Sequence, residues 1–187
     1  MAKIIEPKTA RIQLRQWRPS DLEPFFTMSS DKQVMKYFPA TLSRSESDGI
    51  ANKCQSLIAE NGWGVWAAQL LETNEFIGMV GLHKPSADLP SSGSVEVLWR
   101  LARPHWGKGY ATEAAAAALR VGFEQLNLQE IVSFAVVNNH PSRAVMERIN
   151  MHNTGKTFMH PDVPAPEHLR EHCLYKISRE HWAAKCA

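Results

Sequence analysis

The sequence predicts an α/β (α+β) fold in which one mixed β-sheet carries helices on both faces. Segments with strand patterns and helix patterns alternate along the chain in the order β-α-α-β-β-β-α-β-α-β-β. The strand–helix–strand unit from residue 94 to 137 implies a parallel strand pair joined by a right-handed crossover. Hairpins before and after this unit add antiparallel neighbours, so we expect both kinds of pairing in one sheet.

The first half of the chain is expected to form three strands and two helices. Apolar Ile12 and Leu14 alternate with polar neighbours, which is the pattern of a half-buried strand. Pro19 opens a short helix, and the Ser43–Glu46 spacing is that of a capping box at the start of a longer one. The expected elements are the strand 11–17, a short helix from Pro19 to Met28, the helix 43–60, and the hairpin strands 63–71 and 76–83.

The second half begins with a loop rich in Pro, Ser and Gly at residues 85–93. A strand rich in branched and aromatic residues follows, then a helix with small and apolar residues on one side, which Asn127 ends as a left-handed stop. The expected elements are the strand 94–102, the helix 107–126, the strand 130–137, the helix 142–149, and the strands 154–159 and 173–177.

Length and composition limit the class of protein. A chain of 187 residues with 44% apolar and 21% charged residues fits one globular domain, residues 1–187. Lys and Arg number 21 against 19 Asp and Glu, so the net charge of +2 argues against a general nucleic-acid binder. Such a balance still permits a small basic pocket for an anionic cofactor.

Cysteine usage and hydropathy favour a cytoplasmic protein. Three cysteines, an odd number with no C-x-x-C pair, argue against a disulfide framework and favour a reducing compartment. The first 17 residues carry five charged side chains and no apolar core of a signal peptide. No apolar stretch approaches the ~18 residues of a membrane span, so we expect no membrane association.

The strongest chemical signal is the segment Trp106–Glu113 (WGKGYATE), which lies between a strand and a helix. Its glycines permit a tight turn and close approach of a ligand, and the free N–H groups of a helix N-terminus favour phosphate. A tight glycine turn without a ligand explains the spacing equally well. A dinucleotide fingerprint fits less well, because Thr112 stands at the third glycine and Glu130 lies at the start of the next strand. No segment matches a phosphate-binding loop of the NTPase type.

The hexapeptide Trp106–Ala111 resembles the Arg/Gln-x-x-Gly-x-Gly/Ala motif by which the GNAT acetyltransferase superfamily cradles a pyrophosphate, although Trp106 departs from the usual Arg or Gln. The stretches 96–103, 106–113 and 139–147 are similar to the RimJ/RimL-type branch, in which Trp at that position is familiar. The resemblance covers about residues 10–178.

This resemblance implies a GNAT-like, mostly antiparallel sheet with a splayed parallel strand pair, acetyl-CoA as acyl donor, and a primary amine as acceptor, either a peptide N-terminus or a small molecule. Backbone N–H groups of the glycine loop would hold the pyrophosphate, the first splayed strand would hold the pantetheine arm, and basic side chains nearby would contact phosphate. The implied cofactor-binding residues are Trp99, Leu101, Arg103, Trp106, Gly107, Lys108, Gly109, Tyr110, Ala111, Thr112, Asn139 and Arg143.

Amine acetylation requires removal of a proton from the amine, and Glu96 is our first candidate for the base because it is a carboxylate inside an otherwise apolar strand. A solvent-facing Glu96 is the competing interpretation. Many relatives place a Tyr general acid where this chain has Met146, so Ser142 is the remaining hydroxyl. Ser142 could equally be a helix N-cap. A general acid is also less necessary, because a leaving thiol with a pKa of about 8.5 departs without much protonation.

The remaining candidates carry weaker signals. Tyr37 and Phe38 lie in an aromatic loop between the first two helices, the region that shapes the acceptor pocket in the similar family, and we expect them to bind substrate. His168 and His172 are four apart but lack a third ligand, so we expect no metal. Cys54 is expected in the core.

The sequence leaves open two alternative functions and the formation of a homodimer. A non-catalytic acetyl-CoA sensor or scaffold with the same fold is the alternative to an enzyme, and Met146 is its only support. A dinucleotide enzyme is a third interpretation. An exposed edge of the last strand would allow a homodimer.

Overall fold

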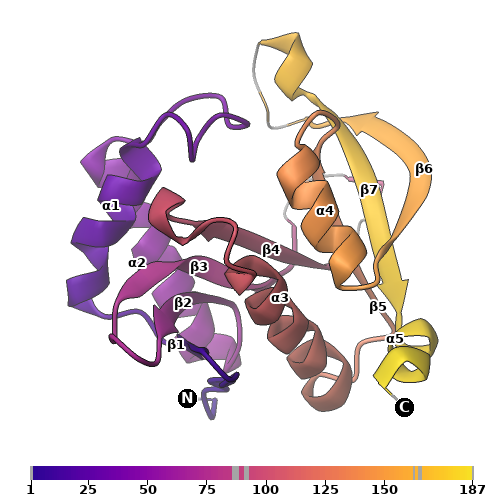
Figure 1. The fold of residues 1–187 in the computed structure, drawn as a ribbon, viewed down its shortest axis with the longest axis horizontal. Coiled ribbons are helices and arrows are strands. Elements are labelled where there is room, and N and C mark those ends of the chain that lie inside the picture. Colours follow the sequence, from indigo (N-terminus) through magenta and orange to yellow (C-terminus); the bar gives the residue numbers. More distant parts are fainter. Residues whose placement is uncertain (1, 86–88, 91–92, 162, 164–165, 187) are drawn as a thin grey trace.

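A seven-stranded mixed sheet organises the part of the chain that the computed structural model describes, residues 2–85, 89–90, 93–161, 163 and 166–186. The strand order is β1-β2-β3-β4-β5-β7-β6, and only the β4–β5 pair is parallel (Figure 1). The predicted fold class is confirmed. The strands are β1 (Ile12–Arg15), β2 (Val65–Leu70), β3 (Phe76–His83), β4 (Val95–Leu101), β5 (Glu130–Val136), β6 (His152–Met159) and β7 (Glu171–Ser178).

The parallel pair opens soon after it begins. Val95 pairs with Ile131 and Glu96 with Val132, and the register of β4 against β5 stops there. By contrast, β3 pairs with β4 along six residues, from His83 opposite Glu96 onward. The chain therefore has the splayed strand pair that the resemblance implied, with the opening on the β5 side of β4.

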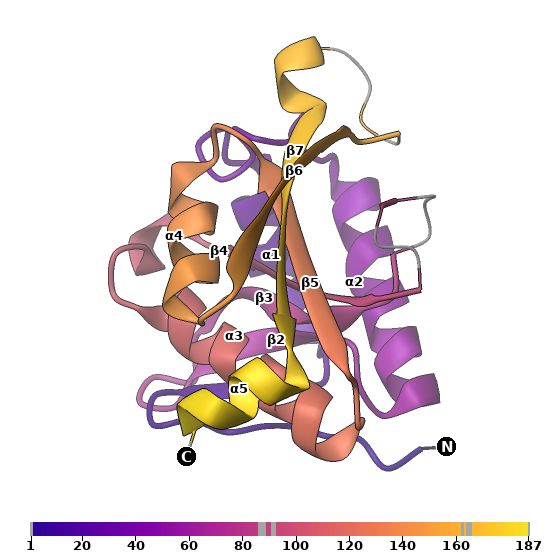
Figure 2. The same ribbon diagram turned by 90° about the vertical axis from the view of Figure 1, so that its right-hand side faces the viewer.

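Helices cover both faces of the sheet, as expected (Figure 2). On one face, the small side chains of α3 let it lie close to β3 and β4, and α4 lies beside it. On the other face, α1 packs on β3 and α2 on β2. The helices are α1 (Leu22–Ser30), α2 (Arg44–Asn61), α3 (Tyr110–Arg120), α4 (His140–Arg148) and α5 (Arg179–Cys186).

Several predicted helix ends are confirmed at the level of single contacts. The Ser43 side chain accepts a hydrogen bond from the Glu46 backbone N–H, and Glu46 accepts in return from the Ser43 N–H at 2.8 Å. The expected end near residue 60 is confirmed too, because α2 stops at Asn61 and Gly62 follows in the left-handed region at φ 81°. Asn127 (φ 55°) is also left-handed, as predicted, after α3 continues into one π-helical turn.

Two predicted helix starts are wrong. The third helix begins at Tyr110 and not at residue 107, because Gly107 and Gly109 adopt positive φ values that a right-handed helix excludes. The fourth begins at His140 and not at Ser142, because the Asn139 side chain accepts from the Ser142 N–H at 3.2 Å and caps the helix two residues earlier.

The C-terminal helix α5 was not predicted. It is short and carries little apolar periodicity, so its position depends on tertiary contacts. Trp182 stacks on Phe123 with ring centroids 5.2 Å apart, and Arg179 donates hydrogen bonds to the carbonyl oxygens of Leu128 and Phe123. These contacts hold α5 against the end of the α3 segment.

The expectation of a dimerising edge on the last strand is also wrong. β7 lies between β5 and β6 and pairs with both, whereas the edge of the sheet on this side is β6. The loop at 85–93 and the Pro-rich segment at 161–166 lie partly outside the described residues. None of the described helices combines the length and apolar character needed to cross a lipid bilayer.

Candidate active site

The loop between β4 and α3 presents a helix N-terminus without a side-chain cap. Gly107 (φ 73°) and Gly109 (φ 80°) turn the chain, and Gly109 is the N-cap residue of α3 with no side-chain hydrogen bond to the first turn. The first N–H groups of α3 therefore lack helix partners and carry the positive end of the helix dipole. A Cβ on Gly107 would meet no atom within 4 Å, so the space beside it is open. The arrangement suits an anion such as a pyrophosphate.

A contact network from the N-terminal segment braces this loop. Arg11 donates through Nε to Glu113 Oε2 at 2.6 Å and through Nη1 to the Lys108 carbonyl at 3.0 Å. The Thr9 hydroxyl donates to Glu113 Oε1 at 2.7 Å. Burial raises the cost of ionising Glu113, but these hydrogen bonds and the Arg11 charge outweigh it and lower the pKa of Glu113. Sequence reasoning missed Arg11, since it lies about a hundred residues from the loop.

Trp106 ties the loop back to the end of β4. Its indole Nε1–H donates to the Leu101 carbonyl at 2.8 Å, while the side chain remains 47% exposed. The Trp106 backbone N–H donates to the Arg103 carbonyl within a 3₁₀ turn, Arg103–His105. Arg103 therefore follows the strand and does not extend it, and the side chains of Arg103 and Lys108 are both exposed. Both cations are free to approach phosphate.

The free edge of β4 offers backbone groups to a ligand. The Ala102 N–H donates to the Ile77 carbonyl of β3, so alternate residues of β4 bond toward β3. The backbone groups of Trp99 and Leu101 therefore point the other way, into the opening where β5 no longer pairs. The Leu101 carbonyl is already occupied by Trp106, which leaves the Leu101 N–H and both backbone groups of Trp99 facing the opening.

The opposite side of the opening is formed by the start of α4. Asn139 uses its side-chain oxygen as the helix cap, which leaves its amide NH₂ available for a ligand. Ser142 lies in the first turn and is half-buried; its side chain is not the cap, contrary to the alternative drawn from sequence. Arg143 donates to the Tyr175 hydroxyl at 3.3 Å and to the Val137 carbonyl at 3.1 Å, so it braces α4 against the middle of β7 and the end of β5.

Glu96 lies where the parallel pair begins to open, and it is buried, with 5% of its surface exposed. Its Oε2 lies 2.6 Å from His83 Nε2 on the neighbouring strand, and the His83 side chain is 34% exposed. Burial raises the pKa of Glu96, and the hydrogen bond and charge of His83 offset part of that rise. The solvent-facing interpretation of Glu96 is wrong. Sequence reasoning did not find His83 as its partner.

Alternation along β4 puts Glu96 and Arg100 on one face, the face covered by α1 and α2. The Arg100 guanidinium carbon lies 4.3 Å from the centroid of the Phe38 ring, which belongs to the segment after α1. Phe38 is 38% exposed. The neighbouring Tyr37 hydroxyl donates to the Asn138 carbonyl at 3.1 Å and so links this segment to the end of β5. The predicted aromatic loop thus contacts β4 at Arg100 through Phe38 and the chain after β5 through Tyr37.

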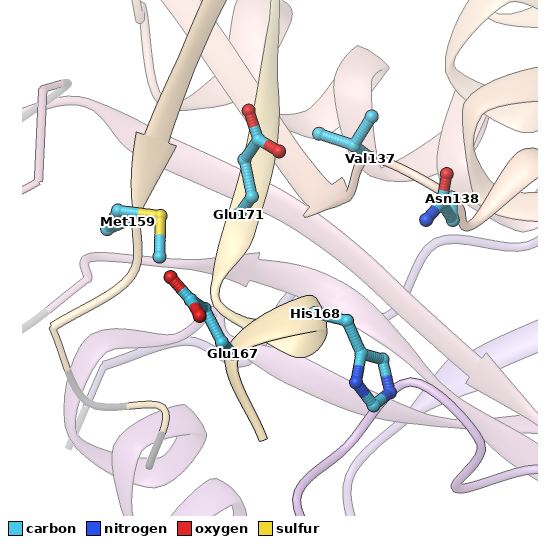
Figure 3. A pocket seen from close by; sticks show the side chains of 6 residues that line it. All are labelled: Val137, Asn138, Met159, Glu167, His168 and Glu171. Carbon is cyan, nitrogen blue, oxygen red and sulfur yellow. The ribbon is translucent and has the colours of Figure 1, made fainter. Parts of the chain in front are cut away.

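A pocket of about 590 Å³ lies at the ends of β5 and β6 and the start of β7, next to the Asn138 that Tyr37 contacts (Figure 3). Sequence reasoning did not predict it, because its walls come from three separate segments. Two carboxylates and an imidazole line it together with apolar side chains. The lining residues are Val137, Asn138, Met159, Glu167, His168 and Glu171.

Other chemical groups of the sequence belong to the core. Cys54 and Cys173 are both buried, as their places on an apolar helix face and in a strand predict, and burial raises the pKa of the Cys54 thiol to about 11. Neither thiol is an activated nucleophile. Met146 is 1% exposed. Among the described residues, no three His, Cys, Asp or Glu side chains gather into a metal site.

Comparison with known proteins agrees with this geometry. A family model described as "Acetyltransferase (GNAT) domain" matches residues 11–152. The chain is 28% identical over 175 residues to the uncharacterized N-acetyltransferase YnaD of Bacillus subtilis, which covers 93% of this chain and 97% of that protein. It is 28% identical over 183 residues to FsC-acetyl coenzyme A-N(2)-transacetylase of Aspergillus fumigatus, covering 93% and 76%. The crystal structure of a GNAT-family acetyltransferase from Bacillus anthracis matches with a TM-score of 0.78 at 27% identity, covering 94% and 99%.

The chain therefore belongs to the GNAT family and is an N-acetyltransferase of that family. Proteins of this family use acetyl-CoA. The residues present fit such a cofactor: an uncapped helix N-terminus with an open glycine suits the pyrophosphate, and the unpaired edge of β4 suits the amides of a pantetheine arm.

Proposed function

We propose that this chain transfers the acetyl group of acetyl-CoA to a primary amine, by direct attack of the amine in a ternary complex. One observation carries the proposal: β4 parts from β5 immediately after Glu96, beside an uncapped helix N-terminus. The opening offers backbone donors for a cofactor on one side and a buried carboxylate at its narrow end.

The cofactor-binding residues are proposed as follows. The backbone N–H groups from Gly107 to Thr112 hold the pyrophosphate, supported by the positive φ of both glycines. The exposed side chains of Lys108 and Arg103 add positive charge. The free backbone groups of Trp99 and Leu101 align the pantetheine arm, and the Asn139 amide faces it from α4. Arg143 contributes by fixing α4 in position, since two of its donors already have protein partners.

Bound acetyl-CoA supplies the acetyl group as an activated thioester. Glu96 accepts the proton of the incoming amine, directly or through water, and its raised pKa brings it closer to the working pH of a general base. His83 holds the Glu96 carboxylate in place and connects it to solvent. The Trp99 N–H, which points into the opening, is placed to stabilise charge on the carbonyl oxygen. Ser142 is the hydroxyl nearest in sequence to the Asn139 cap and is the candidate acid, should the thiolate need one.

The acceptor is a protein N-terminus or a small amine, consistent with the resemblance to the RimJ/RimL-type branch. We assign the region bordered by Tyr37 and Phe38 to acceptor binding. The pocket that carries Glu167 and Glu171 favours an approaching ammonium group, because two carboxylates make its potential negative.

Calorimetry with acetyl-CoA, followed by a thiol-release assay on a panel of N-terminal peptides, polyamines and small amines, tests the proposal. We expect binding and amine-dependent release. Binding with no release across the panel would favour a sensor. A thermal shift with NAD(P) instead would favour the dinucleotide interpretation.

A further inference from the structure

Arg100 is a cation whose donors lack partners inside the protein. Its Nε and Nη1 are enclosed and hydrogen-bond to no other group, and in the described part of the chain no carboxylate lies within ion-pair distance of it. The Phe38 ring covers one side of the guanidinium at 4.3 Å. Burial lowers the pKa of Arg100 to about 10, so it still carries its charge at neutral pH. Unpaired buried donors lower the stability of the folded protein, so their presence points to a function outside folding, such as ligand binding.

The position of Arg100 indicates the reason. Arg100 and Glu96 share one face of β4, and their Cα atoms are four residues, about 13 Å, apart along the strand. Residues between them line the opening where β5 no longer pairs. The residue as a whole is only half-buried, so part of the side chain remains reachable from outside. A guanidinium there faces the region that we assign to the acceptor.

We propose that Arg100 binds an anionic group, a carboxylate or a phosphate, on the acceptor, so that the substrate is a small amine with a negative charge several bonds from its nitrogen. The inference rests on the proposed function and narrows its acceptor class. The guanidinium supplies a planar set of donors that matches both kinds of anion. Polyamines and peptide N-termini with neutral neighbours would leave these donors unpaired.

Matched pairs of amines test this subsite. Amino carboxylates of increasing chain length are compared with their carboxamides, and aminoalkyl phosphates with the parent amino alcohols, which separates carboxylate from phosphate. We expect the charged member to have a kcat/KM about 10- to 100-fold higher at the best chain length. Arg100→Met should abolish this preference, and Arg100→Lys should restore part of it. Arg44→Met is the control, because Arg44 also lies over a ring, that of Phe26, yet pairs with Glu23 and Asp48.

Two further measurements distinguish anion binding by Arg100 from a purely structural role of Arg100, and they do not depend on the acetyl-transfer reaction. Because Arg100 has no hydrogen-bond or ion-pair partner to lose, and Met can still pack on the Phe38 ring, Arg100→Met should keep or raise the melting temperature. Hexanoate and inorganic phosphate are titrated by NMR in the presence of CoA. At least one of these two anions should bind to the wild-type protein and not to Arg100→Met. Equal kcat/KM for charged and neutral members, or a preference that survives Arg100→Met, would overturn the inference while the acetyltransferase activity stands. If no amine is acetylated, the proposed function fails, and the titration alone decides the anion subsite.

Discussion

Glu96 and His83 face each other across the β3–β4 ladder, with Glu96 Oε2 and His83 Nε2 2.6 Å apart, at the residue where β4 parts from β5. One partner is buried and the other reaches solvent. Through His83, the Glu96 carboxylate, whose pKa burial raises, is connected to solvent at the narrow end of the opening between β4 and β5. This relationship gives the first two predictions.

Glu96→Gln should lower kcat/KM for the amine about 10²- to 10⁴-fold, the usual contribution of a general base. A base must be deprotonated to act, so the wild-type rate should fall as pH drops through the raised pKa of Glu96. In Glu96→Gln, only ionisation of the amine should remain on the acid limb. A pH–rate profile of both proteins checks this, and an unchanged acid limb in the variant would reject Glu96 as the base.

The same substitution should raise stability near neutral pH. Because the pKa of Glu96 is higher in the folded than in the unfolded chain, the folded state binds more protons and loses stability as pH rises through that pKa. Gln carries no charge to desolvate. Thermal unfolding of both proteins between pH 4 and 8 should show a difference that grows with pH; a variant that is less stable throughout would contradict it.

Gly107→Ala should weaken acetyl-CoA binding. Alanine at φ 73° costs about 1–2 kcal/mol of backbone strain and places a methyl group in the open space beside the turn. Gly155 is a matched control, since it has the same φ and equally open surroundings but lies in β6. Calorimetry should show weaker binding for Gly107→Ala alone, with similar losses of stability in both. Equal affinity in the two variants would exclude the loop as the pyrophosphate site.

Asn139→Ala should destabilise the protein by about 1 kcal/mol, because it removes the N-cap of α4. Ser142→Ala should leave the melting temperature nearly unchanged, since its hydroxyl is not the cap. Any loss of turnover in Ser142→Ala then reports chemistry and not folding. Denaturant unfolding beside steady-state kinetics makes the comparison, and a larger stability loss in Ser142→Ala would reverse the assignment.

Glu113→Gln should loosen the cofactor loop. It removes the ion pair with Arg11, a partly exposed contact worth up to about 1 kcal/mol. Because the pKa of Glu113 is lowered in the folded state, its contribution is present at neutral pH and is lost as pH falls below the ordinary range of a carboxyl group. We expect a higher KM for acetyl-CoA with kcat nearly kept. A lower kcat at unchanged KM would place Glu113 elsewhere in the mechanism.

The sequence was sufficient to predict the parallel pairing of β4 with β5 and the features with local causes. The capping box at Ser43, the left-handed Asn127 and the glycine turn at Gly107 depend on nearby residues, and each was predictable. The start of α4 was missed because Asn and Ser both cap helices well, and only the fold decides between them.

Contacts between distant segments could not be derived in the same way. Arg11 reaches Glu113, and Phe38 covers Arg100, only after the sheet has brought their segments together. The face shared by Glu96 and Arg100 was available from alternation along the strand, yet nothing in the sequence shows that Arg100 would lack a partner.

Transfer of an isotopically labelled acetyl group tests the central claim most directly. Labelled acetyl-CoA is mixed with the protein and an accepted amine, and mass spectrometry locates the label on the amine, the protein or the residual cofactor. Because the thiols of Cys54 and Cys173 are buried with raised pKa values, neither is an activated nucleophile, and we expect the label on the amine nitrogen and none on the protein. Label on the protein before the amine is added would contradict direct attack, and label that stays with CoA would contradict the proposed activity itself.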